Sequence, residues 1–454
     1  MKDRLLEAVR RANADYVDVR FEECDRTNVD FRRDHVEGVG SSRMTGGIVR
    51  ACHKGGWGIT TFDLLDDLDK SVAEACDGAR LVGRGQTELG EVDGAADGVD
   101  ITVEMTEDPR GVSLDEKIAL VREYNDILLG HDNIESSDVG YLDAFRTITF
   151  ASSRGVNFSE QRPGCAINMS ATARDGKLLQ RASDALRSRD DFGALRGKGE
   201  LADIVGGRAS SLLKAPPCPG GTSTVVLDAE MAGVFMHEAF GHLSEGDHIY
   251  EDKKLARLVH LGREVGPKEL NVVDDGTIPG LPGTTAFDDE GTPPQKTYLI
   301  KDGVLVGYLH SLETAGKMQH RPTGNARAGQ RGQTPQVRMT NTLIENGPKT
   351  REEVFAGIDR GIYACGMFGG NTQLEMFSFS AAYGYLIENG QVGELVRDVM
   401  LAGNVFETLH SIDAIGNDQR IPARGGSCGK GGQGVPVALG SPHIRIRDVV
   451  VGGR

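Results

Sequence analysis

Residues 214–242 read KAPPCPGGTSTVVLDAEMAGVFMHEAFGH. The Pro- and Gly-rich opening of this stretch is the clearest boundary in the chain, because neither residue continues a helix or a central strand. After it we expect a strand from Thr224 to Leu227 and then a helix from about Ala229 to Phe240, with Asp228 near the N-cap. A separate module therefore begins at this boundary.

Two histidines, His237 and His242, lie five residues apart at the end of the stretch, and Glu238 follows the first directly. The familiar zinc-protease motif places its histidines at i and i+4, on one helix face. At about 100° per residue, the spacing found here separates the two rings by about 140° on a regular helix. Because Gly241 readily adopts the left-handed conformation that ends a helix, we expect a break there that returns His242 toward His237.

A thiol completes a plausible ligand set for a metal. Cys428 lies in the glycine-rich stretch 425–432. Zinc bound by two imidazoles accepts a thiolate as third ligand and keeps a fourth position for water. Glu238 is placed to take the proton from that water.

Other residues compete for the same roles. The alternative third ligands are Glu245, Asp247 and His248, and Asp247 is also a candidate outer partner of a histidine. In the alternative interpretation, without a metal, the two histidines are ordinary hydrogen-bonding residues in a turn.

Several motifs resemble the TldD/PmbA family of metallopeptidases. Those near the candidate site are His-Glu-Ala-Phe-Gly-His with Glu245-Gly246-Asp247, Ser427-Cys428-Gly429-Lys430 and Arg338-Met339-Thr340-Asn341-Thr342. Others that follow the family order are Gly46-Gly47-Ile48-Val49-Arg50, Gly56-Trp57-Gly58, Asp288-Asp289-Glu290-Gly291 and Gly324-Asn325-Ala326-Arg327. The resemblance covers most of the chain, and the intact histidine motif is similar to that of the TldD-type catalytic subunit.

The resemblance implies that His237, His242 and Cys428 bind Zn²⁺ and that Glu238 is the general base. It also implies hydrolysis of small, unfolded or extended peptides inside an enclosed dimer. The partner in that dimer is a PmbA/TldE-type chain or a second copy of this one, and both stay open.

Composition indicates a cytoplasmic enzyme. The 454 residues carry a net charge of −16, which argues against a nucleic-acid partner. No apolar run approaches the roughly 18 residues of a membrane span, and residues 1–23 lack the apolar core of a signal peptide. Seven cysteines without a C-x-x-C pair are typical of a reducing compartment.

The fold class that we predict is α+β. An N-terminal α/β-type mixed region precedes a mostly antiparallel, barrel-like β domain that carries the H-E-x-x-x-H helix. The predicted domains are 1–95, 96–215 and 218–454, with a linker or exposed loop over 85–100. The signals for these elements are a capped helix over 113–129, a polar helix near 183–195, and hairpin turns at Asp175-Gly176, Asp302-Gly303 and Asn389-Gly390.

Two rival functions stay open. In one, the protein is a metal-free modulator or binding subunit of a peptidase complex. In the other, Cys428 is the nucleophile of a hydrolase with a histidine as base. The arginines of the segment 321–338 are either a clamp for a peptide carboxylate or structural ion pairs, and His410 is a candidate accessory oxyanion donor.

Overall fold

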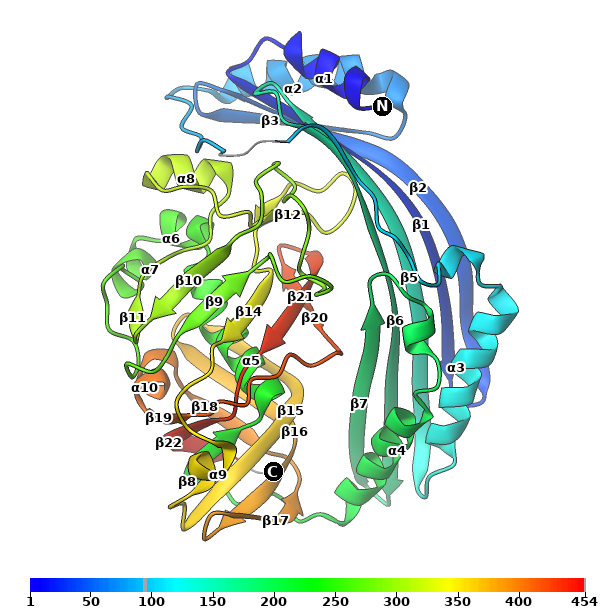
Figure 1. Ribbon diagram of the computed structural model, residues 1–454, viewed down its shortest axis with the longest axis vertical. Coiled ribbons are helices and arrows are strands. Elements are labelled where there is room, and N and C mark those ends of the chain that lie inside the picture. The colour runs from blue at the N-terminus through cyan, green and yellow to red at the C-terminus, as the bar shows by residue number, and fades with distance from the viewer. Residues whose placement is uncertain (93–95, 453–454) are drawn as a thin grey trace.

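The computed structural model describes residues 1–92 and 96–452 (Figure 1). The boundary predicted at residue 95 and part of the linker predicted over 85–100 fall outside these ranges. Within them, strand β4 (Asp97–Ile101) takes up the last residues of that predicted linker. None of the helices in the described ranges is long and apolar enough to cross a bilayer.

A seven-stranded sheet fills the N-terminal half. Its strands, in sheet order, are β3 (Gly56–Phe62), β2 (His35–His53), β1 (Tyr16–Arg32), β5 (Ile134–Ser152), β6 (Asn157–Asp175) and β4, with β7 (Leu178–Ser188) paired to β6. The long strands β1, β2, β5 and β6 curve around the C-terminal half in Figure 1. Because β1 pairs with β5, the segments predicted as 1–95 and 96–215 share one sheet, and their division into two domains stays a prediction.

Four helices pack on this sheet in two pairs, each with its own core. They are α1 (Lys2–Arg10) with α2 (Leu68–Val82), and α3 (Leu114–Leu129) with α4 (Gly199–Lys214). The apolar face of α1 buries Leu5 and Val9 in the first core. The predicted cap of α3 is confirmed, since the Ser113 hydroxyl accepts a hydrogen bond from Glu116 N–H at 3.3 Å.

The three predicted hairpins are confirmed. Asp175-Gly176 joins β6 to β7, and the other two turns join β10 (Lys296–Lys301) to β11 (Val304–Leu305) and β16 (Met376–Glu388) to β17 (Gln391–Val396). In these two turns both central residues have positive φ, which the I′ hairpin turn requires and which favours Asp or Asn followed by Gly.

The polar helix predicted near 183–195 is wrong. Residues up to Ser188 continue β7, because each of them finds a partner on β6. Tertiary pairing therefore overrides the polar composition of this segment, and the helix comes later, at α4.

The C-terminal half contains the predicted barrel-like domain, which is mostly antiparallel. Five strands form a closed ring, because β15 pairs with both β8 and β16. In ring order they are β15 (Arg360–Gln373), β8 (Gly221–Leu227), β22 (Ile444–Gly452), β18 (Met400–Asn404) and β16. Only the pairing of β15 with β8 is parallel among the described strands of the ring.

A six-stranded mixed sheet lies beside the barrel. Its order is β11, β10, β9 (Val272–Asp275), β14 (Asn341–Ile344), β21 (Gln433–Gly440) and β20 (Gly426–Lys430), so β20 is an edge strand. The shorter elements of this half are α6 (Gly246–Glu251), α7 (Lys253–Leu258), α8 (Leu312–Met318), α9 (Arg351–Phe355), α10 (Val405–His410), β12 (Ala326–Arg327), β13 (Gln336–Val337) and β19 (Ile412–Ile415).

The motif helix α5 (Ala229–Met236) follows β8 and lies between the barrel and this mixed sheet. On the barrel side, the Phe235 ring packs edge-on against Phe377, with centroids 5.2 Å apart. On the sheet side, a Cβ at Gly233 would lie 2.8 Å from the backbone nitrogen of Gly440 in β21. Glycine is therefore needed where the helix touches the strand, and α5 is fixed from both sides.

Buried ion pairs join the N-terminal sheet to the C-terminal half, and we call them the ionic seam. Arg50 on β2 contacts Glu290 at 2.8 Å and also pairs with Asp18. Arg20 on β1 and Arg162 on β6 contact Asp289 at 3.2 and 2.8 Å. Because these carboxylates are buried, removing one arginine leaves charge without compensation.

Arg50→Gln tests the seam. It strands the Asp18 and Glu290 carboxylates in the interior, so we expect a loss of about 3–5 kcal/mol in the free energy of unfolding, measured with urea. The matched control is Arg43→Gln on the same strand, whose exposed pair with Glu23 is worth under about 1 kcal/mol. Equal effects of the two variants would show that the seam does not stabilise the fold.

Candidate metal centre

The motif helix changes its hydrogen-bond pattern at the first histidine. As predicted, Asp228 caps α5, accepting a hydrogen bond from Met231 N–H at 2.7 Å. Residues His237–Gly241 then form one turn of π-helix, closed by a hydrogen bond from His242 N–H to the His237 carbonyl. An i→i+5 bond brings residues five apart to neighbouring positions. The two imidazole rings consequently lie with their centroids 5.2 Å apart.

Gly241 has a different role from the predicted one. Its φ of −56° and ψ of −48° are right-handed helical values, so the prediction of a left-handed break is wrong. A Cβ at this position would lie 2.1 Å from the Met339 sulfur. Glycine is therefore required because the π turn packs directly on the segment that leads into β14.

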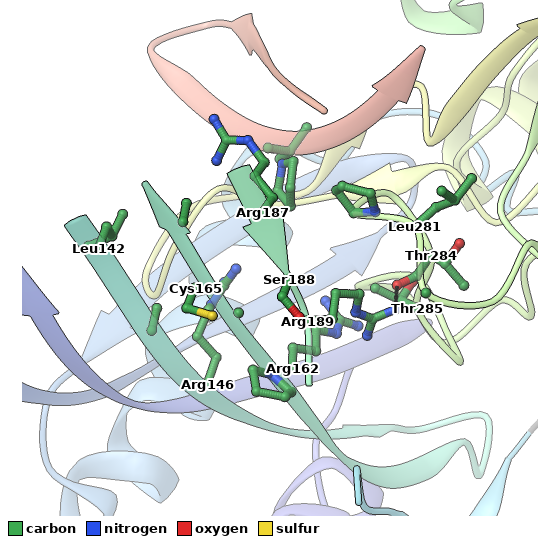
Figure 2. Close-up of a pocket in the computed structure, with 18 of the residues that line it drawn as sticks. Leu142, Arg146, Arg162, Cys165, Arg187, Ser188, Arg189, Leu281, Thr284 and Thr285 are labelled. Carbon is green, nitrogen blue, oxygen red and sulfur yellow. Dashed lines mark hydrogen bonds between the residues drawn. The ribbon is translucent and has the colours of Figure 1, made fainter. Parts of the chain in front are cut away.

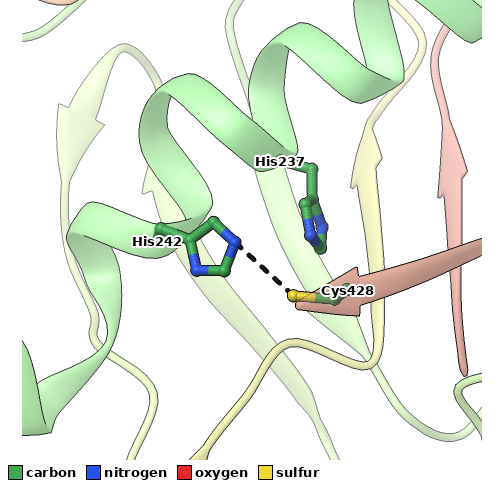
Figure 3. A group of neighbouring side chains, drawn as sticks. All are labelled: His237, His242 and Cys428. Carbon is green, nitrogen blue, oxygen red and sulfur yellow. Dashed lines mark hydrogen bonds between the residues drawn. The ribbon is translucent and has the colours of Figure 1, made fainter. Parts of the chain in front are cut away.

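The structure brings His237, His242 and Cys428 together (Figure 3). One donor atom from each lies within 4.8 Å of the other two. The Cys428 sulfur on β20 is 3.4 Å from His242 Nε2. Nitrogen and sulfur ligands of one tetrahedral zinc are separated by about 3.5 Å, so this spacing fits a shared ion.

His237 is buried, and only one of its ring nitrogens is hydrogen-bonded. Nδ1 lies 3.3 Å from the Thr342 hydroxyl, which itself donates to Asp274 at 3.3 Å. The hydroxyl must therefore accept from Nδ1–H, which leaves the Nε2 lone pair free. Nε2 has no partner among the described residues, and burial lowers the pKa of the ring well below its ordinary value. A neutral imidazole with a free buried lone pair fits a metal ligand.

His242 is oriented by a second carboxylate. Its Nδ1 lies 3.2 Å from Glu245, a fully buried residue that also accepts from the Lys430 ammonium at 2.9 Å. Burial lowers the pKa of His242, but the hydrogen bonds to Cys428 and Glu245 outweigh that effect and raise the pKa to about 10. A metal and a proton compete for the same Nε2 lone pair.

Glu238 lies at the wall of an open cavity next to these groups. Its carboxylate is 3.8 Å from His242 Nε2, and its side chain is 41% exposed. Partial burial raises the pKa of Glu238 above its ordinary value. The cavity has a volume of about 490 Å³, and its lining includes His242, Gly429 and Lys430. A molecule in this cavity can reach both Glu238 and His242.

The competing third ligands lie just beyond this group. Glu245, Asp247 and His248 form a cluster of their own, but the Lys430 ammonium contacts both carboxylates, at 2.9 and 2.7 Å. The Lys430 ammonium therefore already supplies the positive charge that a metal ion would bring to these carboxylates. The carboxylate next to a histidine ring is Glu245, whereas Asp247 accepts from Lys430.

The arginines of the segment 321–338 that could form a clamp do not line this cavity. Arg338 is fully buried and donates to the carbonyls of Cys428 and Gln433, which holds the β20–β21 hairpin in place. Arg327 donates to the carbonyls of Met339 and Pro436 in the same way. His410 is exposed at the end of α10 and does not line the cavity either.

Two features of the site were not predicted from the sequence: the Asp274–Thr342 pair and the π turn. The Asp274–Thr342 pair that orients His237 comes from β9 and β14, which are far from the motif in sequence. The π turn itself carries one signal, because histidines at i and i+5 on an otherwise regular helix match an i→i+5 hydrogen bond.

Comparisons with known proteins agree over most of the chain. Profiles of the PmbA/TldA metallopeptidase family match residues 17–79 (domain 1), 107–214 (central domain) and 220–453 (C-terminal domain). Metalloprotease slr0863 of Synechocystis sp. is 42% identical over 445 residues, which cover 98% of this chain and 96% of the relative. A zinc metalloprotease TldD homolog of Saccharolobus solfataricus is 29% identical over 331 residues, covering 71% of this chain and 72% of the relative.

The crystal structure of TldE from Thermococcus kodakarensis has the same fold. It matches with a TM-score of 0.74 at 17% identity and covers 97% of both chains. The likeness in fold, the three matching domain profiles and the 42% identical relative point the same way. The chain belongs to the TldD/PmbA family of metallopeptidases.

Proposed function

We propose that this metallopeptidase is a TldD-type zinc enzyme in which His237, His242 and Cys428 hold the metal and Glu238 is the general base. The observation that carries the proposal is the unpartnered, buried Nε2 of His237 beside a second imidazole and a thiol. The zinc metalloprotease among the relatives supports the choice of metal. A purely structural histidine pair gives no reason for a buried nitrogen without a partner.

When bound, zinc supplies Lewis acidity, which acidifies water and polarises a peptide carbonyl. The chain's own residues do the rest. Asp274 through Thr342 and Glu245 directly fix the two rings with Nε2 toward Cys428. Glu238 accepts a proton from the attacking water at its carboxylate and returns it to the leaving amine. Its raised pKa suits it to hold that proton between the two steps.

We propose an extended, unfolded peptide as the substrate. Because β20 is an edge strand, its outer side is available for main-chain pairing with a peptide that lies in the cavity. Pairing of this kind depends little on side chains, so it fits small peptides of varied sequence. The space beside this strand edge is open, since a Cβ at Gly429, which lines the cavity, would meet nothing within 4 Å.

We propose further that the enzyme works as a dimer with a PmbA/TldE-type partner or with a second copy. Exposed apolar side chains on the outer part of the β15–β16 hairpin, beside the cavity, support the proposal that a partner covers this surface. Leu374 in the turn is 59% exposed and Met376 after it is 55% exposed, while Phe368, within β15, is 59% exposed. Leu374 also lines the cavity, so a partner on this surface would enclose the substrate.

Zinc analysis tests the ligand set. Purified wild-type protein is expected to contain roughly one zinc per chain, and His242→Ala and Cys428→Ala are expected to lose most of it, because each removes one of three protein ligands. Matched controls are His410→Ala, at an exposed histidine, and Cys76→Ala, at a buried cysteine of α2. Unchanged zinc in Cys428→Ala would remove Cys428 from the ligand set.

The 3.4 Å contact between His242 and Cys428 would also suit a cysteine hydrolase. Thiol alkylation of the same proteins distinguishes this function from that of a zinc enzyme. A zinc-bound thiolate is protected until a chelator is added. A nucleophilic Cys428 is expected to react at the same rate with and without chelator, and a metal-free modulator is expected to contain no zinc at all.

Glu238→Gln tests the general base. Since the amide cannot accept the proton, we expect kcat for peptide hydrolysis to fall by about 10²–10⁴-fold while the zinc content stays unchanged. Glu251→Gln changes a carboxylate that lines the same cavity but forms no part of the proposed machinery, and it is expected to leave kcat near the wild-type value. Full activity in Glu238→Gln would assign the proton transfer to another group.

Gly241→Ala tests the π turn. The new Cβ would meet the Met339 sulfur at 2.1 Å, so we expect the turn to shift and zinc to be lost. Met339→Ala in the same chain removes that sulfur and is expected to restore much of the zinc. Gly78→Ala is the control, because a Cβ at this helical position meets only Gly58 at 3.4 Å. If the added Met339→Ala change does not restore zinc, the contact between Gly241 and Met339 is not what positions the two histidines.

A further inference from the structure

A second cavity, of about 570 Å³, lies between the N-terminal sheet and the C-terminal half (Figure 2). Arginine side chains enter it from β5, β6 and β7, and Leu281, Thr284 and Thr285 lie opposite them in Figure 2. Its size falls in the range of about 300–1,000 Å³ that is usual for ligand pockets. None of the residues that line it belongs to the proposed zinc site.

Positive charge in this cavity exceeds what the chain neutralises. Among the residues that the structure describes, five arginines line it against a single acidic residue, Asp289. Arg146 pairs with Glu22 at 2.7 Å, and Arg162 pairs with Glu160 and Asp289, each at 2.8 Å. Asp289 is also occupied by Arg20 in the ionic seam. The acidic groups around the cavity are therefore already in use.

The remaining three arginines form no ion pair with any residue that the structure describes. Arg187 donates to the Arg424 carbonyl at 2.6 Å and weakly to Asn168. Arg189 donates to the Thr284 carbonyl at 2.7 Å. Arg327 is buried, and its hydrogen-bond acceptors are the backbone carbonyls described above. Burial lowers the pKa of all three. Carboxylates farther away partly offset this effect for Arg189 and Arg327, whereas Arg187 has only the like charge of Arg424 beside it.

Most of the remaining wall is apolar. Leu142 and Leu281 line it together with the pyrrolidine rings of Pro163, Pro282 and Pro422. A polyphosphate or a free inorganic anion has no apolar surface to place against these rings. A ligand with one anionic end and a hydrocarbon body matches both parts of the wall, and guanidinium groups bind carboxylates through paired hydrogen bonds.

We propose that this cavity binds the free carboxylate end of a short peptide at Arg187 and Arg189. The identity of the ligand as a peptide rests on the proposed function. The β20–β21 hairpin links the two sites, since Gly429 and Lys430 line the cavity at Glu238 while Val435 and Pro436 line this one. The arginine cavity is thus a second peptide-binding site, selective for a terminal carboxylate, on the other part of the hairpin that carries Cys428.

Equilibrium binding to Glu238→Gln protein tests the proposal without any turnover. The probes are an acetylated tripeptide of apolar residues with a free C-terminal carboxylate and the same tripeptide as its C-terminal amide. We expect the acid to bind at least about ten-fold more tightly than the amide, because Arg187 and Arg189 are half-buried and a hydrogen bond to a charged group contributes about 1.5–3 kcal/mol. The preference is expected to weaken at high salt.

The double variant Arg187→Gln/Arg189→Gln, in the same Glu238→Gln background, is expected to lose the preference for the acid. Arg181→Gln, on the same strand but outside the cavity lining, is the matched control and is expected to keep it. Zinc content is measured in parallel and is expected to be unchanged. Absence of zinc would thus count against the proposed function, whereas equal binding of acid and amide to the zinc-containing protein would overturn the carboxylate site.

Inorganic phosphate serves as a competitor. Weak competition at millimolar concentration is expected for a carboxylate site. Tight phosphate binding that depends on Arg187 and Arg189, with no preference for the acid peptide, would assign the cavity to an inorganic anion and overturn the proposal. The comparison of acid with amide uses the intact arginine pair, so it stands even if the double variant does not fold.

Discussion

A single hydrogen bond, from His242 N–H to the His237 carbonyl, sets the geometry on which the candidate site depends. Without this i→i+5 bond, a regular helix would point the two rings about 140° apart. The bond is possible because α5 is fixed on both sides and because Gly241 lets the widened turn lie against Met339. The unusual turn is thus supported by packing rather than by local preference, as is common for π turns at functional sites.

The surroundings of the site are built in layers that begin far from it. Arg338 holds the β20–β21 hairpin that carries Cys428, and buried carboxylates on β9 and after the π turn orient the two rings. The ionic seam then fixes the N-terminal sheet against the same half of the molecule. Because the sheet curves around that half, its inner face and the hairpin enclose the arginine cavity. One hairpin therefore contributes to both cavities.

Turns and helix caps were predicted correctly from the sequence, because the residues that form them lie within a few positions of one another. The Asp302-Gly303 and Asn389-Gly390 turns have positive φ at both positions. Asp228 and Ser113 satisfy free N–H groups at helix starts, so these elements agree with the prediction. The segment 183–195 failed for the opposite reason. Its polar residues have no strong local preference, and pairing with β6, which lies across a hairpin, decides that residues 183–188 form a strand.

The sequence by itself determined the α+β class, the family resemblance and the candidates His237, Glu238, His242 and Cys428, because the motif and the glycine-rich loop around Cys428 are contiguous segments. It did not determine how His237 and His242 come together, since a left-handed break and a π turn satisfy the same spacing. Only the tertiary structure decided that, because the choice depends on a close contact between Gly241 and Met339, almost one hundred residues apart. The arginine cavity could not be predicted from the sequence either. Its excess of positive charge depends on which arginines form ion pairs in the folded protein, and only the tertiary structure decides that.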